Sequence, residues 1–321
     1  LWDELDAIAK RTHDDIVIID DVHAFGASQA WKDVSWRSVV NRLGRVDMVS
    51  VQMDKLIVYR GSGREFPEPK VSIIIPAYGL PDISIKCLDH IEKYAGVPVE
   101  IIFVDNGSKP EDQARVRNRL MQLPAPVVWV QNSFNAGHSI AINQGLALSS
   151  GHPLLLNNDA YLTPGCLESL LWSVENRHKI SAVVPLTNGG GMAVIQRGTR
   201  AAPLADPIAS SDPEYRSAKA KELTSDRELA RMKMVPFFCV LFNRDAFDQI
   251  GSLDSERFRD GLASDDDWCD RARRHGWRVG IAADAFCIHL GSQTFRRMRI
   301  NRNVVSAHAK LRKKRRAVER G

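Results

Sequence analysis

The sequence predicts an α/β protein built on a mainly parallel β-sheet with helices covering both faces. Short apolar runs alternate with segments of helical spacing between residues 70 and 160. Strands that alternate with helices indicate a mainly parallel sheet with both faces covered. The longest apolar runs, such as Val71–Ile75 and Phe237–Phe242, have the length of a strand and fall far short of the roughly 20 residues of a membrane-spanning helix.

Composition places the chain among globular proteins. Its 321 residues suffice for one large domain with an appendage or for two modest domains. Hydrophobic residues make up 44% and charged residues 26%, which excludes disordered, collagen-like and membrane-bundle classes. No secretory signal is recognisable, and five scattered cysteines without CxxC spacing are typical of reduced, buried thiols. We therefore expect a cytoplasmic protein.

Residues 1–69 are predicted to form a small α/β segment followed by a linker. The expected elements are a helix over 1–11, a short buried strand over 16–19, a helix over 30–43 and extended or hairpin structure over 46–59. Glycine and proline crowd residues 61–69, so we expect a domain boundary there.

Residues 70–295 carry the predicted parallel sheet. We expect strands over 71–75, 99–104, 127–131 and 154–156, with helices over 84–94, 112–123 and 139–149 between them. Pro76 is expected to stop the first strand. Residues 189–212 are predicted to be a loop or flexible insertion, and order is expected to resume at Val235.

Polar residues follow three of these strands. Asp105, Asn135 and Asp159 come after the second, third and fourth strand. Ligands of parallel α/β sheets bind outside the carboxyl ends of the strands, so this edge is the predicted binding site.

Asp159 ends the run Asn157-Asn158-Asp159 directly after a buried strand. A carboxylate held rigidly there suits a hard cation such as Mg²⁺ or Mn²⁺ that bridges diphosphate oxygens. The alternative is that Asp159 only caps the following turn.

Three adjacent carboxylates, Asp265, Asp266 and Asp267, open a predicted helix. The helix dipole favours acids there, and a carboxylate beside another one can also act as a general base. His289 ends a short apolar strand, where it is either a structural residue or a metal ligand together with Asp159.

Together these features resemble glycosyltransferase family 2, inverting enzymes with the GT-A fold, over residues 71–295. The resemblance implies roles for the following residues. Donor binding would involve Pro76, Ala77, Tyr78, Asp105, Asn135, Gly137 and Asn158, and the metal ligands would be Asp159 and His289. Asp254 and Trp268 would lie on the acceptor side, and Asp265 or Asp266 would be the catalytic base.

Two positions depart from the family pattern. Asn157 replaces the first aspartate of the metal-binding DxD motif, and Ser264 replaces the glutamate before the catalytic aspartate. By register the base is Asp265, with Asp266 as the alternative. The pattern is most similar to the bacterial rhamnosyl- and galactofuranosyl-type transferases.

The resemblance implies transfer of a sugar from a UDP- or dTDP-sugar to an acceptor hydroxyl, with inversion and with Mg²⁺ or Mn²⁺. The acceptor would be a saccharide or a lipid-linked molecule in polysaccharide or glycolipid synthesis. Two other hypotheses stay open. Asn157 and Ser264 favour a degenerate domain that acts as a binding or scaffold module, whereas a sugar-phosphate nucleotidyltransferase would need a glycine-rich loop in place of residues 76–81.

The N-terminal segment has a fainter resemblance. Residues 14–23 and 54–59 are similar to the final third of a Rossmann-type methyltransferase. The glycine-rich cofactor loop is absent, so the resemblance implies a remnant that does not bind S-adenosylmethionine alone.

Residues 296–321 form a basic tail, predicted to be helical. They carry a net charge of +10, which leaves −5 for the rest of the chain. The tail is interpreted as a solvated helix face or as a peripheral contact with anionic lipid at the inner face of the membrane. Nucleic acid is disfavoured, because no aromatic residues are interleaved with the charges.

Overall fold

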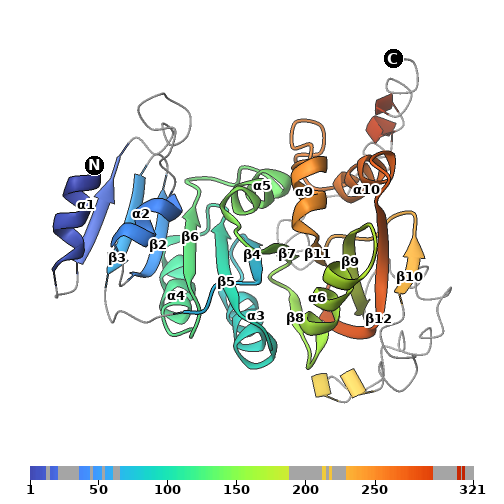
Figure 1. Cartoon of the computed structure of the whole chain (residues 1–321), viewed down its shortest axis with the longest axis horizontal. Helices are drawn as coiled ribbons and strands as arrows, with labels where there is room; N and C mark the ends of the chain where they lie inside the picture. Colours follow the sequence, from blue (N-terminus) through green and yellow to red (C-terminus); the bar gives the residue numbers. More distant parts are fainter. Residues whose placement is uncertain are drawn as a thin grey trace.

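In the computed structural model the chain is a three-layer α/β/α protein (Figure 1). The structure describes residues 1–11, 15–20, 36–43, 46–52, 55–60, 66–187, 212–214, 217–218, 229–291, 309–311 and 313–314. The predicted α/β class with a large, mainly parallel sheet is confirmed for this part of the chain.

Within the described residues, twelve strands form one sheet. They are β1 (Asp15–Ile19), β2 (Val46–Gln52), β3 (Lys55–Arg60), β4 (Val71–Ala77), β5 (Val99–Asp105), β6 (Val127–Gln131), β7 (His152–Leu156), β8 (Ala160–Leu162), β9 (Ile180–Thr187), β10 (Leu229–Met232), β11 (Cys239–Phe242) and β12 (Arg278–His289). The order is β1-β3-β2-β6-β5-β4-β7-β11-β9-β12-β10, with β8 paired to β12. The run β2-β6-β5-β4-β7 is parallel throughout, so its strands end at one edge.

Helices cover both faces of the sheet. They are α1 (Trp2–Ala9), α2 (Trp36–Leu43), α3 (Pro81–Tyr94), α4 (Pro110–Leu120), α5 (His138–Leu148), α6 (Cys166–Asn176), α9 (Arg244–Ile250) and α10 (Ser264–Arg274). One hydrophobic core contains residues of α1, α2, α5, α9 and α10, and a second contains residues of α3, α4 and α6. The helices therefore form two separate layers, which Figure 1 shows on opposite sides of the strands.

The first strand of the parallel run is longer than predicted. Pro76 was expected to stop it, yet β4 continues to Ala77, and Pro76 pairs with Val104 of β5. The ladder to β7 ends at Ile74, so Pro76 has a strand neighbour on one side only. A proline is tolerated in such a place because its missing N–H interrupts no second ladder.

Strand β1 is exposed, and the prediction of a buried strand over 16–19 is wrong. Ile16 and Ile18 are 64% and 60% exposed, and only Ile19 is buried. The cause is topology, since β1 lies at the edge of the sheet and pairs with β3 alone.

The sheet continues across the predicted linker. Strand β2 pairs in parallel with β6 from Met48 to Gln52, so the strands before residue 61 extend the sheet of the segment that follows it. The division into residues 1–69, 70–295 and 296–321 stays a prediction.

Other expectations have mixed outcomes. All five cysteines are buried and free, as predicted. The strand that His289 ends is twelve residues long rather than short, and order resumes at β10, before Val235. Residues 188–211, 30–35 and 21–23, on which predictions were also made, lie outside the described residues.

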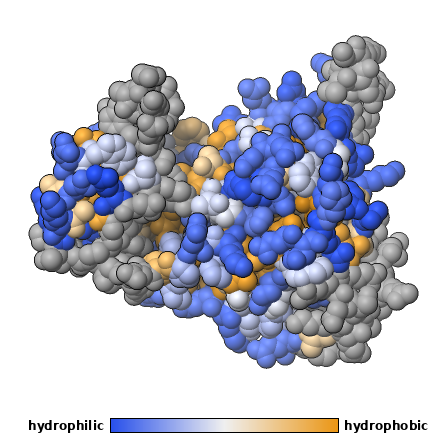
Figure 2. All heavy atoms as spheres, viewed as in Figure 1, coloured by the Kyte–Doolittle hydropathy of each residue, from blue (hydrophilic) through white to orange (hydrophobic). Residues whose placement is uncertain are grey.

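No helix in the described residues is long and apolar enough to cross a membrane. The face of the molecule in Figure 2 is largely hydrophilic, with apolar atoms in patches between the charged ones.

Candidate active site at the carboxyl ends of the strands

The loops after β4, β5 and β6 are joined by backbone hydrogen bonds. The Asn106 N–H donates to the Ala77 carbonyl at 2.8 Å, and the Asn132 N–H donates to the Asp105 carbonyl at 2.9 Å. The Gly79 N–H donates to Ser108 Oγ at 2.7 Å. The predicted donor residues Pro76, Ala77 and Tyr78 therefore lie directly beside the turn that follows Asp105.

Asn106 is the centre of a side-chain network that fastens these loops. Its Oδ1 accepts from Asn132 Nδ2 and from the Ala136 N–H, both at 3.0 Å. Its Nδ2 donates to Asn135 Oδ1 at 3.0 Å, and Asn135 Oδ1 also accepts from the Gly137 N–H at 3.0 Å. The predicted residues Asn135 and Gly137 are thus brought next to Asp105. Sequence reasoning assigned no role to Asn106 or Asn132. Asn106 lies two residues after the predicted strand over 99–104, and Asn132 directly follows the predicted strand over 127–131.

Asp105 ends β5 and is almost fully buried. Its Oδ2 accepts hydrogen bonds from Gln113 Nε2 at 2.7 Å and from the Ser108 N–H at 3.2 Å. Burial raises the pKa of Asp105, and these hydrogen bonds oppose the rise. A buried acceptor held in this way suits recognition of an N–H donor such as a base edge.

Asp159 and His289 form the second half of the site. His289 Nε2 lies 3.3 Å from Asp159 Oδ1, and both side chains are largely buried. The imidazole stacks on Phe238, with ring centroids 4.8 Å apart, and the Leu290 N–H donates to the Asp159 carbonyl at 3.0 Å. Strand β8 pairs with β12 between these residues, which explains why two positions far apart in sequence meet.

The donor set around this pair fits part of a divalent-metal shell. No group of three or more His, Cys, Asp and Glu side chains in the described residues is arranged to hold a metal. However, Asn157 Oδ1 is buried and has no hydrogen-bond partner in the described part of the chain. Asp159, His289 and this amide oxygen are ligand types that Mn²⁺ or Mg²⁺ accepts, and diphosphate oxygens would complete the shell.

Asn158 supports this loop from behind. Its side chain is buried and donates to Ser84 Oγ of α3 at 3.0 Å. The amide therefore anchors the Asn157–Asp159 turn to α3.

The three carboxylates of α10 differ in their surroundings. Asp267 is buried, and its carboxylate pairs with Arg271 Nε at 3.1 Å and Lys314 Nζ at 2.7 Å. Asp265 and Asp266 are partly exposed, and the Asp266 N–H donates to Asp265 Oδ1 at 3.0 Å. The structure thus leaves Asp265 and Asp266 as the accessible candidates for a base.

The acceptor-side segment, residues 251–263, connects α9 to α10. Asp254 in this segment accepts from Lys314 Nζ at 2.8 Å and from Arg257 Nη1 at 2.9 Å. Burial raises the pKa of Asp254, but the hydrogen bonds from Lys314 and Arg257 prevail and lower it to about 2. Trp268 is fully buried, and its Nε1 donates to the Gly251 carbonyl at 2.9 Å. The indole therefore holds the segment in place, and an acceptor has no access to it in this structure.

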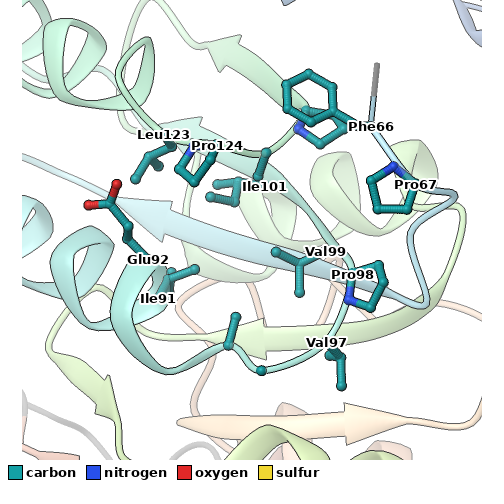
Figure 3. Close-up of a pocket in the computed structure, with 14 residues that line it drawn as sticks. Phe66, Pro67, Ile91, Glu92, Val97, Pro98, Val99, Ile101, Leu123 and Pro124 are labelled. Atoms are coloured by element: carbon teal, nitrogen blue, oxygen red, sulfur yellow. The ribbon is translucent and has the colours of Figure 1, made fainter. Parts of the chain in front are cut away.

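An apolar cavity of about 340 Å³ lies at the opposite end of the sheet. Figure 3 shows Phe66, Pro67, Val99 and Pro124 around it, near the residues where β4, β5 and β6 begin. Because the candidate site lies where these strands end, this cavity does not belong to it.

The sequence profile described as "Glycosyl transferase family 2" matches residues 72–251, more than half of the chain. The chain belongs to glycosyltransferase family 2. The match includes the loops after β4 to β7, which carry Asp105 and Asp159, whereas Asp265 and His289 lie beyond its end.

Two bacterial relatives agree with the family. The chain is 30% identical over 107 residues to the uncharacterized glycosyltransferase YwdF of Bacillus subtilis, and 23% identical over 108 residues to the glycosyltransferase GlyG of Streptococcus pneumoniae. The matched part is 33% of this chain in both cases, and 38% and 36% of the relatives.

A solved structure shares the fold. The mannosyltransferase PcManGT from Pyrobaculum calidifontis, in complex with GDP-Man and Mn²⁺, aligns with a TM-score of 0.54 at 19% identity. The alignment covers 77% of this chain and 65% of that protein. The predicted GT-A fold is confirmed by this likeness.

Proposed function

We propose that the protein is an inverting glycosyltransferase, which moves a sugar from a UDP- or dTDP-sugar to an acceptor hydroxyl in polysaccharide or glycolipid synthesis. The observation that carries the proposal is the placement of Asp105 and the Asp159–His289 pair at one edge of the parallel sheet, with the loops around Asp105 fastened by Asn106. Ligands of such sheets bind at this edge.

The donor's nucleoside lies against the loops after β4 and β5. Asp105 Oδ2 accepts from the base, because it is a buried acceptor whose geometry Gln113 and Ser108 already fix. Tyr78 is partly exposed next to it and flanks the same space. Asn135 and Gly137 form the wall after β6, which Asn106 holds in place.

Asp159 and His289, with Asn157 Oδ1, would hold Mg²⁺ or Mn²⁺ next to the donor's diphosphate. When bound, the metal neutralises charge that develops on the leaving diphosphate. The support is the 3.3 Å Asp159–His289 contact and the buried amide oxygen of Asn157, two residues before Asp159 in the chain. The related mannosyltransferase PcManGT was determined with GDP-Man and Mn²⁺.

Asp265 is the general base, with Asp266 as the alternative. Both lie in the first turn of α10 and remain accessible, whereas Asp267 is neutralised by two cations. Asp265 takes the proton of the acceptor hydroxyl as that oxygen attacks the anomeric carbon. Attack opposite the leaving diphosphate inverts the anomeric configuration.

Further parts of the proposal concern acceptor and place. A saccharide or lipid-linked acceptor approaches the acceptor-side segment, and the basic tail attracts anionic lipid at the cytoplasmic face of a membrane. Within the family, we place the chain nearest to the rhamnosyl- and galactofuranosyl-type transferases.

The experiment is a thermal-shift and calorimetry panel of UDP, dTDP and GDP, each with and without MnCl₂. A ligand of the native state raises the midpoint by mass action. We expect one nucleotide to stabilise the protein in a metal-dependent manner, and we expect Asp159→Ala to abolish the metal dependence. Asp248→Ala, at an exposed acid of α9, is the matched control and should respond like the wild type.

The outcomes separate the candidate functions. Metal-dependent binding followed by donor turnover supports the transferase. Nucleotide binding without turnover of any donor sugar would favour a binding module, the alternative that Asn157 suggests. If none of the nucleotides binds, the proposal is wrong.

A further inference from the structure

The C-terminal segment, here residues 309–311 and 313–314, packs against the acceptor side of the candidate site. Lys314 Nζ lies 2.8 Å from Asp254 Oδ2 and 2.7 Å from Asp267 Oδ1, and the lysine side chain is only 20% exposed. One turn earlier, Leu311 is buried and packs with Phe258 and Ala263. In Figure 1 this segment lies beside α10, close to the end of the chain.

Lys314 joins the acceptor-side segment to α10. Among the described residues, the other ion pairs of Asp254 and Asp267 are with arginines three or four residues away. Asp254 belongs to the acceptor-side segment and also pairs with Arg257, three residues away. Asp267 belongs to the first turn of α10 and also pairs with Arg271, four residues away. The ammonium of Lys314 is shared between the two carboxylates, so it fixes the segment relative to the helix that carries Asp265.

The acceptor-side segment 251–263 also contacts the loop after β6, which carries Asn135 and is called the donor loop below. Arg259 Nε donates to the Ala136 carbonyl at 2.7 Å, and the Arg259 carbonyl accepts from the Ser139 N–H at 3.1 Å. Gly137 has φ +106°, and a Cβ there would lie 2.6 Å from Arg259 Cγ. The backbone of Gly137 therefore packs directly against Arg259. We expect a displacement of the acceptor-side segment to displace the loop that holds Asn135.

We propose that Lys314 is a positioning residue of the active site, which sets the acceptor-side segment 251–263 against both the donor loop and the first turn of α10. The C-terminal segment is then a working part of the acceptor site in addition to any role at a membrane. This inference rests on the proposed function for its catalytic meaning, while its structural part can be tested without a substrate.

The test is hydrogen–deuterium exchange on the full chain, with and without UDP, dTDP or GDP plus MnCl₂. Lys314→Met keeps the length of the side chain and removes its charge. We expect amide exchange in residues 252–262 and 136–139 to rise about tenfold, with no change in the β5 peptide 99–105. Lys314→Arg should restore the wild-type rates, and the control Lys310→Met, at an exposed lysine of the same segment, should not change them.

Coupling to the donor gives a second readout. If a nucleotide lowers amide exchange in residues 252–262 of the wild type, linkage requires that Lys314→Met lowers the affinity for that nucleotide. We expect a decrease of about three- to tenfold. The proposal is overturned if exchange in 252–262 stays at the wild-type rate, if it rises equally in residues 99–105, or if Lys314→Arg fails to restore it. A wild type that binds none of the three nucleotides would contradict the proposed function, and the exchange comparison without nucleotide would still decide the role of Lys314.

Discussion

The side chain of Asn143 makes two hydrogen bonds to the backbone of Leu253. Its Nδ2 donates to the Leu253 carbonyl at 2.9 Å, and its Oδ1 accepts from the Leu253 N–H at 3.0 Å. Asn143 lies on α5 and Leu253 on the acceptor-side segment 251–263, so a single side-chain amide joins this helix to that segment.

Asn143→Ala should destabilise the protein by about 1–3 kcal/mol, because the buried Leu253 N–H would lose its partner. The Leu253 carbonyl would still accept from the Ser255 N–H at 2.9 Å. Urea denaturation measures the free energy of unfolding. Asn176→Ala, at an exposed amide that donates to Trp172 within the same helix, is the control and should cost less than about 0.5 kcal/mol. Equal losses in the two variants would show that the Asn143 contact has no special weight.

The two accessible aspartates of α10 can be separated by kinetics. Asp265→Asn should lower kcat by about 100- to 10,000-fold, because a general base contributes this much, while the affinity for the nucleotide stays near that of the wild type. Asp266→Asn should lower kcat by less than about tenfold. Donor turnover and nucleotide calorimetry on both folded variants provide the measurement. The opposite ranking would identify Asp266 as the base.

Asp105 should show opposite effects on stability and on binding. Its pKa is raised above 3.8, mainly by burial, so its ionisation is less favourable in the folded protein than in the unfolded chain. The contribution to stability is therefore greatest below 3.8 and is lost as the pH rises through the raised pKa. Asn cannot ionise, so Asp105→Asn should become more stable than the wild type as the pH rises. The same substitution should lower the affinity for the nucleotide at least about tenfold.

Thermal midpoints of wild type and Asp105→Asn between about pH 4 and about pH 7 test this prediction. The difference between the two midpoints should grow in favour of the variant towards neutral pH. Glu111→Gln, at an exposed acid on α4, serves as the control. A difference that does not change with pH would show that burial of the Asp105 carboxylate carries no cost.

The edge strand β1 should tolerate polar substitution on its exposed face. Ile18→Thr should change the free energy of unfolding by less than about 0.5 kcal/mol, because the side chain is 60% exposed. Leu56→Ala, on the neighbouring strand but fully buried, should cost about 2–5 kcal/mol. A loss above about 1.5 kcal/mol for Ile18→Thr, measured in urea, would mean that this face is covered in solution.

The central part of the fold was predictable because its signals are local. Short apolar runs such as Val71–Ile75, which alternate with segments of helical spacing, are typical of strands in a covered sheet. Parallel strands bring residues such as Asp105 and Asp159 to one edge. The family motifs then indicated the same residues. Burial of the strand over 16–19 could not be read in this way, because its exposure follows from its place at the edge of the sheet.

The remaining features depend on contacts between distant segments. Asn106 has its role only because the loops after β5 and β6 converge on its amide. Trp268 has the residue type of a sugar-binding platform, and its burial against Phe242 follows from the helix packing. Lys314 is one cation among many in a basic tail, and only the tertiary structure distinguishes it by its two carboxylate partners.

The parallel ladder between β2 and β6 has a consequence for how the chain is made. Strand β2 is synthesised before β6, and it has to wait for α3, β5 and α4 to emerge before its partner exists. Until then the edge of β2 that will face β6 has no partner, and parallel pairing of strands so far apart in sequence forms slowly. Growing chains would thus carry a strand that is paired with β3 on one edge and open on the other, a state in which nascent proteins are vulnerable to aggregation.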